Sequence, residues 1–401
     1  MKVLVSAGEA SSDLYGAQLI VALRRRARAD DEPLEFMGVG GDAMRAAGCD
    51  TVVDARHLAV VGMTEILGHL PKIYSEFRKL LRAVDKNPNQ PGIAIVIDSP
   101  AFNFRVARAL HRRGTPVIYF VAPQLWAWRE YRVRRVQKWI KKVLCIFPFE
   151  EEFYRRHGVE VEYVGHPLAD LNDPSISREE YARQNGLDAA KPWIALLPGS
   201  RKKEVRSNLR TMVEAVANLQ KKSHKNFQFI IPIAANLDTG WMRMSLARTR
   251  ISTVEPDSPA AVIAVSDARS ALFHSRAALV ASGTATVEAA LMGCPFVAVY
   301  RLSPLTFWIA KRLVKVSYAA MPNLIAGRQI VTELLQNNFT PERAAAEMGA
   351  LLEEGIKRQQ VLTGLAEVRQ RLKSGSDARK GSAIERAADA ILRVLPPSEA
   401  R

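Results

Sequence analysis

Two short segments of the sequence combine glycine with hydroxyl and charged side chains in a way that suits a phosphate group. The first contains Gly199, Ser200, Arg201 and Glu204, and the second contains Ser282, Gly283, Thr284, Ala285 and Thr286. Each follows a short apolar run typical of a buried strand and precedes a helical pattern. Such a turn directs backbone N–H groups and the positive end of a helix dipole toward an anion. Thr284 or Thr286 is expected to cap the helix of the second segment. Together the segments predict a diphosphate site, although the first alone could be an ordinary strand-to-helix turn with a solvated Arg201.

Two carboxylates stand where they could act on a bound ligand. Asp98 ends the apolar run Ile93–Ile97, and a carboxylate at the carboxyl end of a buried strand can act as a general base. The competing interpretation makes Asp98 the N-cap of the next helix. Glu288 falls in the first turns of the helix after Thr284. It could accept hydrogen bonds from ribose hydroxyls, or it could only complement the helix dipole.

The first turn of the chain is built from small residues and could accommodate a second ligand. It includes Gly8, Glu9, Ala10 and Ser11. The spacing is not GxGxxG, so a dinucleotide fingerprint is absent. The alternative is a tight turn in which Ser11 or Ser12 caps a helix. His166, which follows the apolar run Val161–Val164, could contact a phosphate or hydroxyl group or could make a structural hydrogen bond.

No pattern of metal ligands occurs in the sequence. No His pair, Cys cluster or Asp-x-Asp sequence stands at the end of a predicted strand, and such groups are the usual ligands of zinc, calcium and magnesium. We therefore expect no metal and no other cofactor. Arg201 and the helix N-termini are expected to neutralise a leaving diphosphate instead.

Apolar runs alternate with helical patterns along most of the chain and place these residues at the ends of strands. The expected strands are Val3–Ser6, Phe36–Val39, Thr51–Val53, Ile93–Ile97, Val117–Val121, Val143–Phe147, Val161–Val164, Ile194–Leu197, Phe229–Ile233, Ala278–Ala281 and Phe296–Val299. This alternation indicates an α/β fold with parallel sheets covered on both faces.

The same pattern divides the chain into domains. We predict two Rossmann-like domains facing a central cleft, over residues 1–168 and 191–340. A linker at 169–190 joins them, and a helical tail at 341–401 is expected to pack back across both. Ligands should bind at the carboxyl ends of the strands.

The composition describes a globular protein with a large excess of positive charge. The 401 residues include 57 Lys and Arg against 41 Asp and Glu, which gives a net charge of +16. This excess would attract nucleic acid, anionic lipid or phosphorylated small molecules. No nucleic-acid-binding signature occurs, so we expect no nucleic-acid partner. Three widely separated cysteines, no signal-peptide anatomy and no apolar run of about 20 residues predict a cytoplasmic protein.

Three segments combine aromatic or apolar residues with basic ones and could rest on an anionic membrane surface. Their candidate membrane-facing residues are Met63, Ile66, Leu67, Trp126, Trp128, Arg132, Arg135, Leu305 and Trp308. The alternative is that each helix packs its apolar side on a sheet and exposes its charges to water. Three such segments in one chain favour peripheral association with a membrane.

Taken together, the motifs resemble those of the lipid-A-disaccharide synthase family. The matching segments are SAGEASSD, IDSPAFNFRVA, PQLWAWR, CIFPFEEEFY, YVGHPL, LLPGSRKKEV, SGTATVEAALMGCP and MPNLIAGR. They occur in the family's order from residue 1 to about Gln336. One departure is Ser12, where the family more often has glycine, and the tail after Pro341 is similar only in its helical character.

The resemblance implies a GT-B glycosyltransferase that inverts the anomeric centre. The donor would be UDP-2,3-diacylglucosamine and the acceptor 2,3-diacylglucosamine 1-phosphate (lipid X). The products would be the β-1,6-linked lipid A disaccharide 1-phosphate and UDP. Peripheral association with the inner face of the cytoplasmic membrane is implied as well, and a homo-oligomer is compatible with the sequence.

The resemblance also gives roles to individual residues. Asp98 would be the general base, and Arg201 would bind the departing diphosphate together with the two helix N-termini. Glu288 would hold the ribose, and Asn323 would contact the nucleotide or the donor sugar.

Two other functions remain compatible with the residues. Another GT-B UDP-sugar transferase or a UDP-sugar epimerase would share the nucleotide-binding half and act on a soluble substrate. A non-catalytic protein that binds anionic lipid or nucleic acid would use only the net charge of +16. Its binding would not depend on Asp98.

Overall fold

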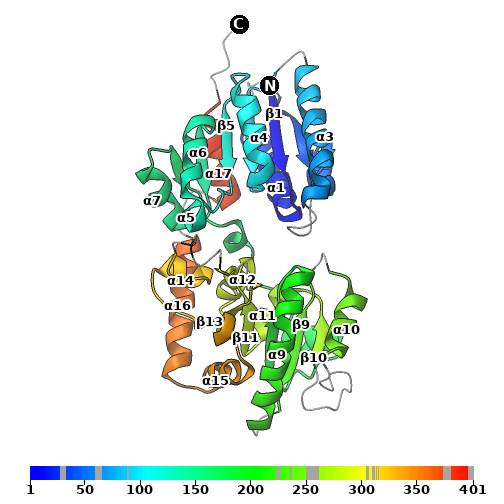
Figure 1. Ribbon diagram of the computed structural model, residues 1–401, viewed down its shortest axis with the longest axis vertical. Helices are drawn as coiled ribbons and strands as arrows, with labels where there is room; N and C mark the ends of the chain where they lie inside the picture. Colours follow the sequence, from blue (N-terminus) through cyan, green and yellow to red (C-terminus); the bar gives the residue numbers. More distant parts are fainter. Residues whose placement is uncertain are drawn as a thin grey trace. The chain divides into compact units, whose positions relative to one another are not determined.

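The chain folds into two compact units, each of them a parallel α/β structure (Figure 1). A computed structural model describes residues 1–27, 33–58, 66–87, 90–222, 226–234, 237–249, 262–303, 307–308, 312, 314, 316–373 and 381–395, with the backbone alone at 10, 66–70 and 262. Unit 1 comprises Met1–Asp170 and Leu372–Arg401, and unit 2 comprises Leu171–Arg371.

Unit 1 is built on a seven-stranded sheet in which all neighbouring strands are parallel. Its strands are β1 (Lys2–Ala7), β2 (Glu35–Gly40), β3 (Cys49–Asp54), β4 (Ile93–Ile97), β5 (Val117–Phe120), β6 (Lys142–Cys145) and β7 (Val161–Tyr163). They lie in the order β3-β2-β1-β4-β5-β6-β7. Every residue of β4 is buried, as expected for an apolar strand that is covered on both faces.

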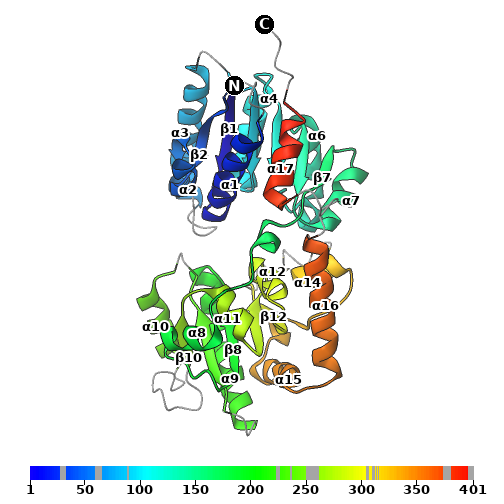
Figure 2. The same ribbon diagram turned by 180° about the vertical axis from the view of Figure 1, so that it is seen from behind.

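Helices cover both faces of this sheet. They are α1 (Ala10–Arg26), α2 (Asp42–Ala46), α3 (Ile66–Asp85), α4 (Pro100–His111), α5 (Leu125–Trp128), α6 (Val133–Trp139), α7 (Pro148–Arg156) and α17 (Ala383–Leu392). Figure 1 shows α4 and α6 in front of the sheet, and Figure 2 shows α1 and α17 from the opposite side. Arg26 pairs with Asp389 at 2.8 Å, and Arg386 Nε donates to the carbonyl of Val164 at 2.7 Å. These contacts fasten the C-terminal helix α17 to unit 1.

Unit 2 is built on a six-stranded parallel sheet. Its strands are β8 (Trp193–Leu197), β9 (Gln228–Pro232), β10 (Val262–Val265), β11 (Ala277–Ala281), β12 (Phe296–Tyr300) and β13 (Glu333–Leu335), in the order β10-β9-β8-β11-β12-β13. Its helices are α8 (Arg178–Asn185), α9 (Lys202–Lys222), α10 (Thr239–Ala247), α11 (Ala268–His274), α12 (Thr284–Leu291), α14 (Met321–Ala326), α15 (Pro341–Leu352) and α16 (Ile356–Lys373). No helix among the described residues is long and apolar enough to cross a bilayer.

The predicted fold class is confirmed, and the structure adds detail at several boundaries. The first helix begins at Ala10 with Glu9 as its N-cap, so Ser11 and Ser12 lie inside the helix and the alternative of a serine cap is wrong. Residues 171–190, predicted as a linker, belong to unit 2 and contain α8. The tail predicted from 341 is divided: α15 and most of α16 belong to unit 2, whereas α17 belongs to unit 1.

Candidate active site

The candidate residues stand at the two points where the strand order changes direction. From β1 the chain moves to β2 on one side and later to β4 on the other, and β8 has the same relation to β9 and β11. In open parallel sheets a ligand binds in the crevice beyond the carboxyl ends of such strands. The register pairs Ala7 with Ile97 and Leu197 with Val280. The turns that follow β1 and β4 are therefore neighbours, and so are the turns that follow β8 and β11.

The turn between β8 and α9 is closed by a carboxylate of the protein itself. Oε2 of Glu204 accepts hydrogen bonds from the backbone N–H groups of Ser200 (3.1 Å) and Arg201 (3.3 Å). Its Oε1 accepts from the guanidinium of Arg201 at 3.2 Å. Gly199 has φ +125°, and a Cβ there would lie 2.6 Å from Glu204 Oε2. The N–H groups of the turn that was predicted to bind an anion are thus engaged by Glu204.

The turn between β11 and α12 is open. Gly283 is the N-cap, at φ +139° and with no side-chain cap, so the prediction that Thr284 or Thr286 caps this helix is wrong. A Cβ on Gly283 would meet no atom within 4 Å. Among the described residues, no protein group accepts a hydrogen bond from the N–H of Thr284 or Ala285. These N–H groups are placed as an anion site requires.

The other hydroxyl residues of this turn hold it in place. Ser282 Oγ donates to the carbonyl of Ala319 at 2.7 Å. Thr286 is buried, its Oγ1 donates to the carbonyl of Gly283 at 2.7 Å, and it accepts from the N–H of Met321 at 3.3 Å. Ser282 therefore joins the turn to the segment before α14, and Thr286 joins it to the first residue of α14. These two residues were predicted to bind the donor, but in the structure their hydroxyl groups position the turn.

Asn323 is fully buried and uses its amide within the protein. Its Oδ1 accepts from the N–H groups of Ile330 (2.7 Å) and Val331 (2.9 Å), and its Nδ2 donates to Glu333 Oε1 (2.8 Å) and to the carbonyl of Val331 (2.9 Å). Two accepted and two donated bonds are the full capacity of an amide. The predicted contact between Asn323 and a nucleotide or sugar therefore does not agree with the structure, because no hydrogen-bonding capacity is left for a ligand.

Glu333, which sequence reasoning missed, completes this network. Its carboxylate also accepts from the N–H groups of Ala319 and Ala320, at 2.9 to 3.1 Å. Ala319 is the residue whose carbonyl Ser282 binds. Asn323 and Glu333 thus position the β11–α12 turn through Ala319 and Ser282. Nothing in the spacing of the sequence indicates that Asn323 and Glu333 pair.

Glu288 lies on α12 and is half-buried. Burial raises the pKa of its carboxyl group, Arg269 opposes the shift, and Asp267 adds to it. A partly desolvated carboxylate gains from a hydroxyl donor, so the predicted contact with ribose remains a prediction that suits this environment.

Asp98 lies at the end of β4 on a backbone that other elements hold. Asp98 and Ser99 have φ of 48° and 44°, a left-handed conformation that is strained for residues other than glycine. The carbonyl of Asp98 accepts hydrogen bonds from Asn103 Nδ2 (2.8 Å) and from the Tyr119 hydroxyl (2.7 Å). The N-cap of α4 is Ser99. The alternative in which Asp98 is the cap is therefore wrong.

The turn after β1 contacts the turn after β4. A Cβ on Gly8 would lie 2.7 Å from Ser99 Oγ, so only glycine allows the two turns to approach so closely. Ser6 Oγ donates to Asn103 Oδ1 at 2.7 Å and links β1 to α4. Glu9 and Ser11 are exposed, and the side chain of Ala10 lies outside the described residues. Of the predicted acceptor residues, Gly8 thus lies beside Ser99, the neighbour of Asp98, and Glu9 and Ser11 follow it in the chain.

His166 is buried and is hydrogen-bonded within the protein. It is 2% exposed, its Nδ1 accepts from the N–H of Leu168 at 3.2 Å, and its ring lies 5.2 Å from that of Phe147. Burial lowers the pKa of the imidazole to about 3. The structural hydrogen bond, which was the alternative for His166, is what the structure contains.

A buried carboxyl group near Asp98 was missed in the sequence. Glu150 is 1% exposed, its Oε1 accepts from Trp126 Nε1 at 3.0 Å, and its Oε2 accepts from the N–H of Phe147 at 3.2 Å. Burial raises its pKa to about 7, and the charge of Asp98 adds to this shift. Trp126, predicted as membrane-facing, instead packs its ring against Phe149 at 4.8 Å and is half-buried.

The remaining aromatic and basic candidates divide into two groups. Trp128 is 42% exposed and stacks under Arg129 at 3.6 Å, and Trp308 is 56% exposed and stacks under Arg312 at 3.5 Å. These two tryptophans follow β5 and β12, so each lies toward the carboxyl edge of its own sheet. Arg132 is half-buried and Arg135 is exposed. Met63 and Leu305, and the side chains of Ile66 and Leu67, lie outside the described residues.

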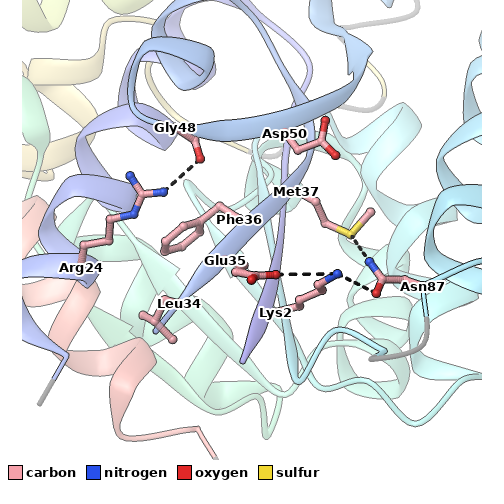
Figure 3. A pocket seen from close by; sticks show the side chains of 9 residues that line it. All are labelled: Lys2, Arg24, Leu34, Glu35, Phe36, Met37, Gly48, Asp50 and Asn87. Carbon is pink, nitrogen blue, oxygen red and sulfur yellow. Dashed lines mark hydrogen bonds and ion pairs between the residues drawn. The ribbon is translucent and has the colours of Figure 1, made fainter. Parts of the chain in front are cut away.

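A cavity of about 300 Å³ lies at the opposite edge of the unit 1 sheet (Figure 3). Its lining residues are Lys2, Arg24, Leu34, Glu35, Phe36, Met37, Gly48, Asp50 and Asn87. Most of them come from the amino ends of β1, β2 and β3, whereas Arg24 lies on α1 and Asn87 follows α3. Lys2 already bonds Asn87 at 2.7 Å, and Arg24 bonds the carbonyl of Gly48 at 3.0 Å. The cavity is therefore separate from the candidate site, and its cations are engaged within the protein.

The described residues contain no cluster of three or more His, Cys, Asp or Glu side chains arranged to hold a metal ion. The charged groups that the candidate site does offer to an anion are the Arg201 guanidinium and the helix N-termini of α9 and α12.

A family of known proteins matches nearly the whole chain. The family model described as lipid-A-disaccharide synthetase matches residues 3–387. The lipid-A-disaccharide synthase of Koribacter versatilis (strain Ellin345) is 52% identical over 394 residues, which cover 98% of each chain. The lipid-A-disaccharide synthase of Acidobacterium capsulatum is 48% identical, over 94% of this chain and 93% of the relative.

Solved structures of other enzymes share the fold. A UDP-GlcNAc 2-epimerase from Neisseria meningitidis, bound to UDP-GlcNAc, superposes with a TM-score of 0.62 at 14% identity, covering 98% of this chain and 99% of the other. The calicheamicin glycosyltransferase CalG4 gives 0.59 at 16% identity with the same coverage. At these identities the likeness concerns the fold alone. It confirms a GT-B-like arrangement of two parallel α/β sheets.

Proposed function

The chain belongs to the lipid-A-disaccharide synthase family and has lipid-A-disaccharide synthase activity, a glycosyl transfer in lipid A biosynthesis; on this premise we propose how its two units divide the reaction. We infer that unit 2 binds the donor, UDP-2,3-diacylglucosamine, and that unit 1 binds the acceptor, lipid X. This division rests on the chemical groups at the two points where the strand order changes direction. Unit 2 offers Arg201 and backbone N–H groups, whereas unit 1 offers the carboxylate of Asp98.

On unit 2, the diphosphate of the donor lies across the two neighbouring turns. The N–H groups of Thr284 and Ala285 and the guanidinium of Arg201 bind its oxygens, and the dipoles of α9 and α12 add to the attraction. Glu288 accepts from the ribose hydroxyls, as an acidic residue does in related nucleotide sites. Ser282, Thr286 and Asn323 position the second turn.

On unit 1, the sugar of the acceptor lies over the turn at Gly8–Ser11, beside Asp98. Gly8 allows this turn to approach the turn at Ser99, which keeps the sugar close to Asp98. Beyond β5, the exposed rings of Trp128 and Tyr131 provide apolar surface for acyl chains, and the half-buried guanidinium groups of Arg129 and Arg132 provide positive charge for the 1-phosphate.

The reaction is a single displacement with inversion. The 6-hydroxyl oxygen of the acceptor attacks the anomeric carbon from the face opposite UDP, while the carboxylate of Asp98 takes the hydroxyl proton. The bond between the anomeric carbon and the diphosphate oxygen breaks, and UDP leaves with the electron pair. Arg201 and the helix N-termini stabilise the charge that develops on the leaving diphosphate.

Both substrates carry acyl chains, so the enzyme must meet them at a lipid surface. We propose peripheral association with the inner face of the cytoplasmic membrane, through exposed residues such as Trp128 and Trp308 and the basic residues beside them. The net charge of +16 supports binding to an anionic leaflet.

The function is tested by the release of UDP from UDP-2,3-diacylglucosamine, measured with and without lipid X. We expect release only when lipid X is present, and an equal rate in EDTA and in added magnesium, because Arg201 and backbone N–H groups carry the diphosphate charge. N-Acetylglucosamine 1-phosphate serves as the soluble control acceptor.

Release of UDP with the soluble acceptor but not with lipid X would contradict the proposed acceptor. It would favour the alternative of a UDP-sugar enzyme that acts on a soluble substrate. Loss of activity in EDTA that magnesium restores would contradict the proposed role of Arg201.

A further inference from the structure

We propose that Glu204 is an internal anion that occupies the diphosphate site of the unliganded enzyme and is displaced when the donor binds. The inference rests on the proposed placement of the diphosphate at the β8–α9 turn. It adds a residue that controls the affinity of this site and its selectivity among anions.

Glu204 engages the donor groups of the β8–α9 turn. They are the backbone N–H groups of Ser200 and Arg201 and the guanidinium of Arg201, at 3.1 to 3.3 Å. These are the donors that a phosphate group would use at this turn. A phosphate oxygen and the carboxylate cannot share them, because both are negatively charged and each would need the same N–H directions.

The second argument is the contrast with the neighbouring turn. A Cβ on Gly199 would collide with Cβ and Oε2 of Glu204, both at 2.6 Å, whereas a Cβ on Gly283 would meet nothing within 4 Å. Since β8 and β11 are adjacent, one half of the proposed diphosphate site is open and the other half is filled. A ligand that spans both halves must remove the carboxylate from the first.

The third argument is that Glu204 can move without loss of the fold. Its side chain is 25% exposed and that of Arg201 is 64% exposed, so the pair is in contact with solvent. Exposed ion pairs of this kind contribute little to stability. The remaining interaction is that of a Glu at the third helical position with the N-terminal N–H groups, which glutamine can also make.

The charges of Glu204 and Arg201 also act near the end of β12. The pKa of Tyr300 is raised first by burial and then by Glu204, and Arg201 opposes the shift. Both charges therefore act at the carboxyl edge of the strand beside β11. When the diphosphate enters, its two or more negative charges replace the single charge of Glu204. The guanidinium of Arg201 then pairs with the ligand instead of with Glu204.

The displacement has consequences for both ends of the catalytic cycle. Ligands with a single phosphate gain fewer contacts and compete less well with Glu204, so the site favours diphosphates. After transfer, the return of Glu204 to the N–H groups assists the release of UDP.

The test measures the affinity of the full-length enzyme for UDP and for uridine by titration calorimetry. Glu204→Gln removes the charge and keeps the helix cap, whereas Glu204→Ala removes both. We expect Glu204→Gln to bind UDP about tenfold more tightly than the wild type does, because the competing anion is gone. Glu204→Ala should bind UDP at least as tightly as the wild type does. Uridine, which has no phosphate, should bind equally to all variants.

The matched control is Glu214→Gln on the same helix. Glu214 pairs with the exposed Arg210 at 2.8 Å and lies beyond the turn, so its removal should leave UDP affinity unchanged. Arg201→Gln tests the premise and should weaken UDP binding without affecting uridine.

The outcomes separate the two proposals. If Arg201→Gln weakens UDP binding but neither Glu204 variant strengthens it, the displacement of Glu204 is wrong and the placement of the diphosphate stands. If Arg201→Gln leaves UDP affinity unchanged, the proposed placement of the diphosphate is itself wrong. Weaker UDP binding in both Glu204 variants would make Glu204 a direct donor-binding residue, as the sequence predicted, and would overturn the inference.

Discussion

At the scale of single residues, the proposed chemistry depends on a few side chains that hold strained or exposed turns. Asp98 and Ser99 lie in left-handed conformations that cost of the order of 1–3 kcal/mol each. Asn103 and Tyr119 bind the carbonyl of Asp98 and keep this conformation in place. Backbone strain that the surroundings maintain is common where a functional group must point in one direction.

Asn323 should be required for donor affinity without touching the donor. Asn323→Ala removes four hydrogen bonds and leaves buried N–H groups without acceptors, which should lower the free energy of unfolding by about 2–4 kcal/mol. It should also weaken UDP binding about tenfold, because the turn at Gly283 loses its support. Denaturant unfolding and UDP titration measure the two effects. Asn87→Ala, at the amino edge of unit 1, is the control and should leave UDP affinity unchanged.

Glu150 should make stability depend on pH in a defined direction. Because its pKa in the folded protein is about 7, above the ordinary 4.5, the folded form holds a proton that the unfolded form has released. The resulting stabilisation is fully present below pH 4.5 and is lost as the pH rises to 7. The free energy of unfolding of the wild type relative to Glu150→Gln should therefore be about 2 kcal/mol larger at pH 5 than at pH 8. An equal difference at both pH values would contradict the assigned burial.

At the scale of elements, the same construction appears four times: a buried parallel strand, a turn with a special backbone, and a helix. The turns after β1, β4, β8 and β11 differ in what they carry. Gly8 allows close packing, Asp98 supplies a carboxylate, and the turns at Gly199 and Gly283 present N–H groups. Function is thus assigned to turns, and the strands determine only which turns are neighbours.

The elements after β5 allow a test of membrane binding. The short helix α6 buries Val133 and Val136 and exposes Arg134, Arg135 and Lys138. Replacing these three cations with glutamine should weaken binding to anionic vesicles and reduce its dependence on salt, since each contributes about 1 kcal/mol near such a surface. Replacing Trp128 and Tyr131 with serine should weaken binding without changing the salt dependence.

Vesicle co-sedimentation across a salt series distinguishes these effects. The control replaces three exposed arginines elsewhere, Arg155, Arg183 and Arg210, and removes the same charge. If all three sets behave alike, the residues of α6 are ordinary solvated charges and the enzyme meets its lipids through another surface.

At the scale of the whole molecule, the sequence predicts the sheets better than the contacts between distant parts. The strands follow from continuous apolar runs such as Ile93–Ile97 and Trp193–Leu197, whose residues are all buried. Glycine and the position after a strand were sufficient to place Asp98 and the turns at Gly199 and Gly283 at the ends of strands, and the anion binding proposed for both turns stays a prediction.

Contacts between distant residues could not be predicted from spacing. Ser6 and Asn103 are 97 residues apart, and Arg386 binds Val164 across 222 residues. Helix α17 belongs to unit 1 because of that contact and its neighbours, although its sequence describes only an amphipathic helix. Local capping was mispredicted for a related reason: serine and threonine favour caps in general, but Glu9 and Gly283 occupy those positions here.

The central claim is that Asp98 on unit 1 takes the proton of the acceptor while unit 2 alone binds the nucleotide. Asp98→Asn tests it most directly, with turnover and UDP affinity measured on the same preparation. We expect turnover to fall by about 10²–10⁴, the contribution of a general base, while UDP affinity and the melting temperature stay at the wild-type values. A variant that keeps its turnover, or that loses turnover only in proportion to a loss of UDP affinity or of folded protein, would contradict this division of the reaction.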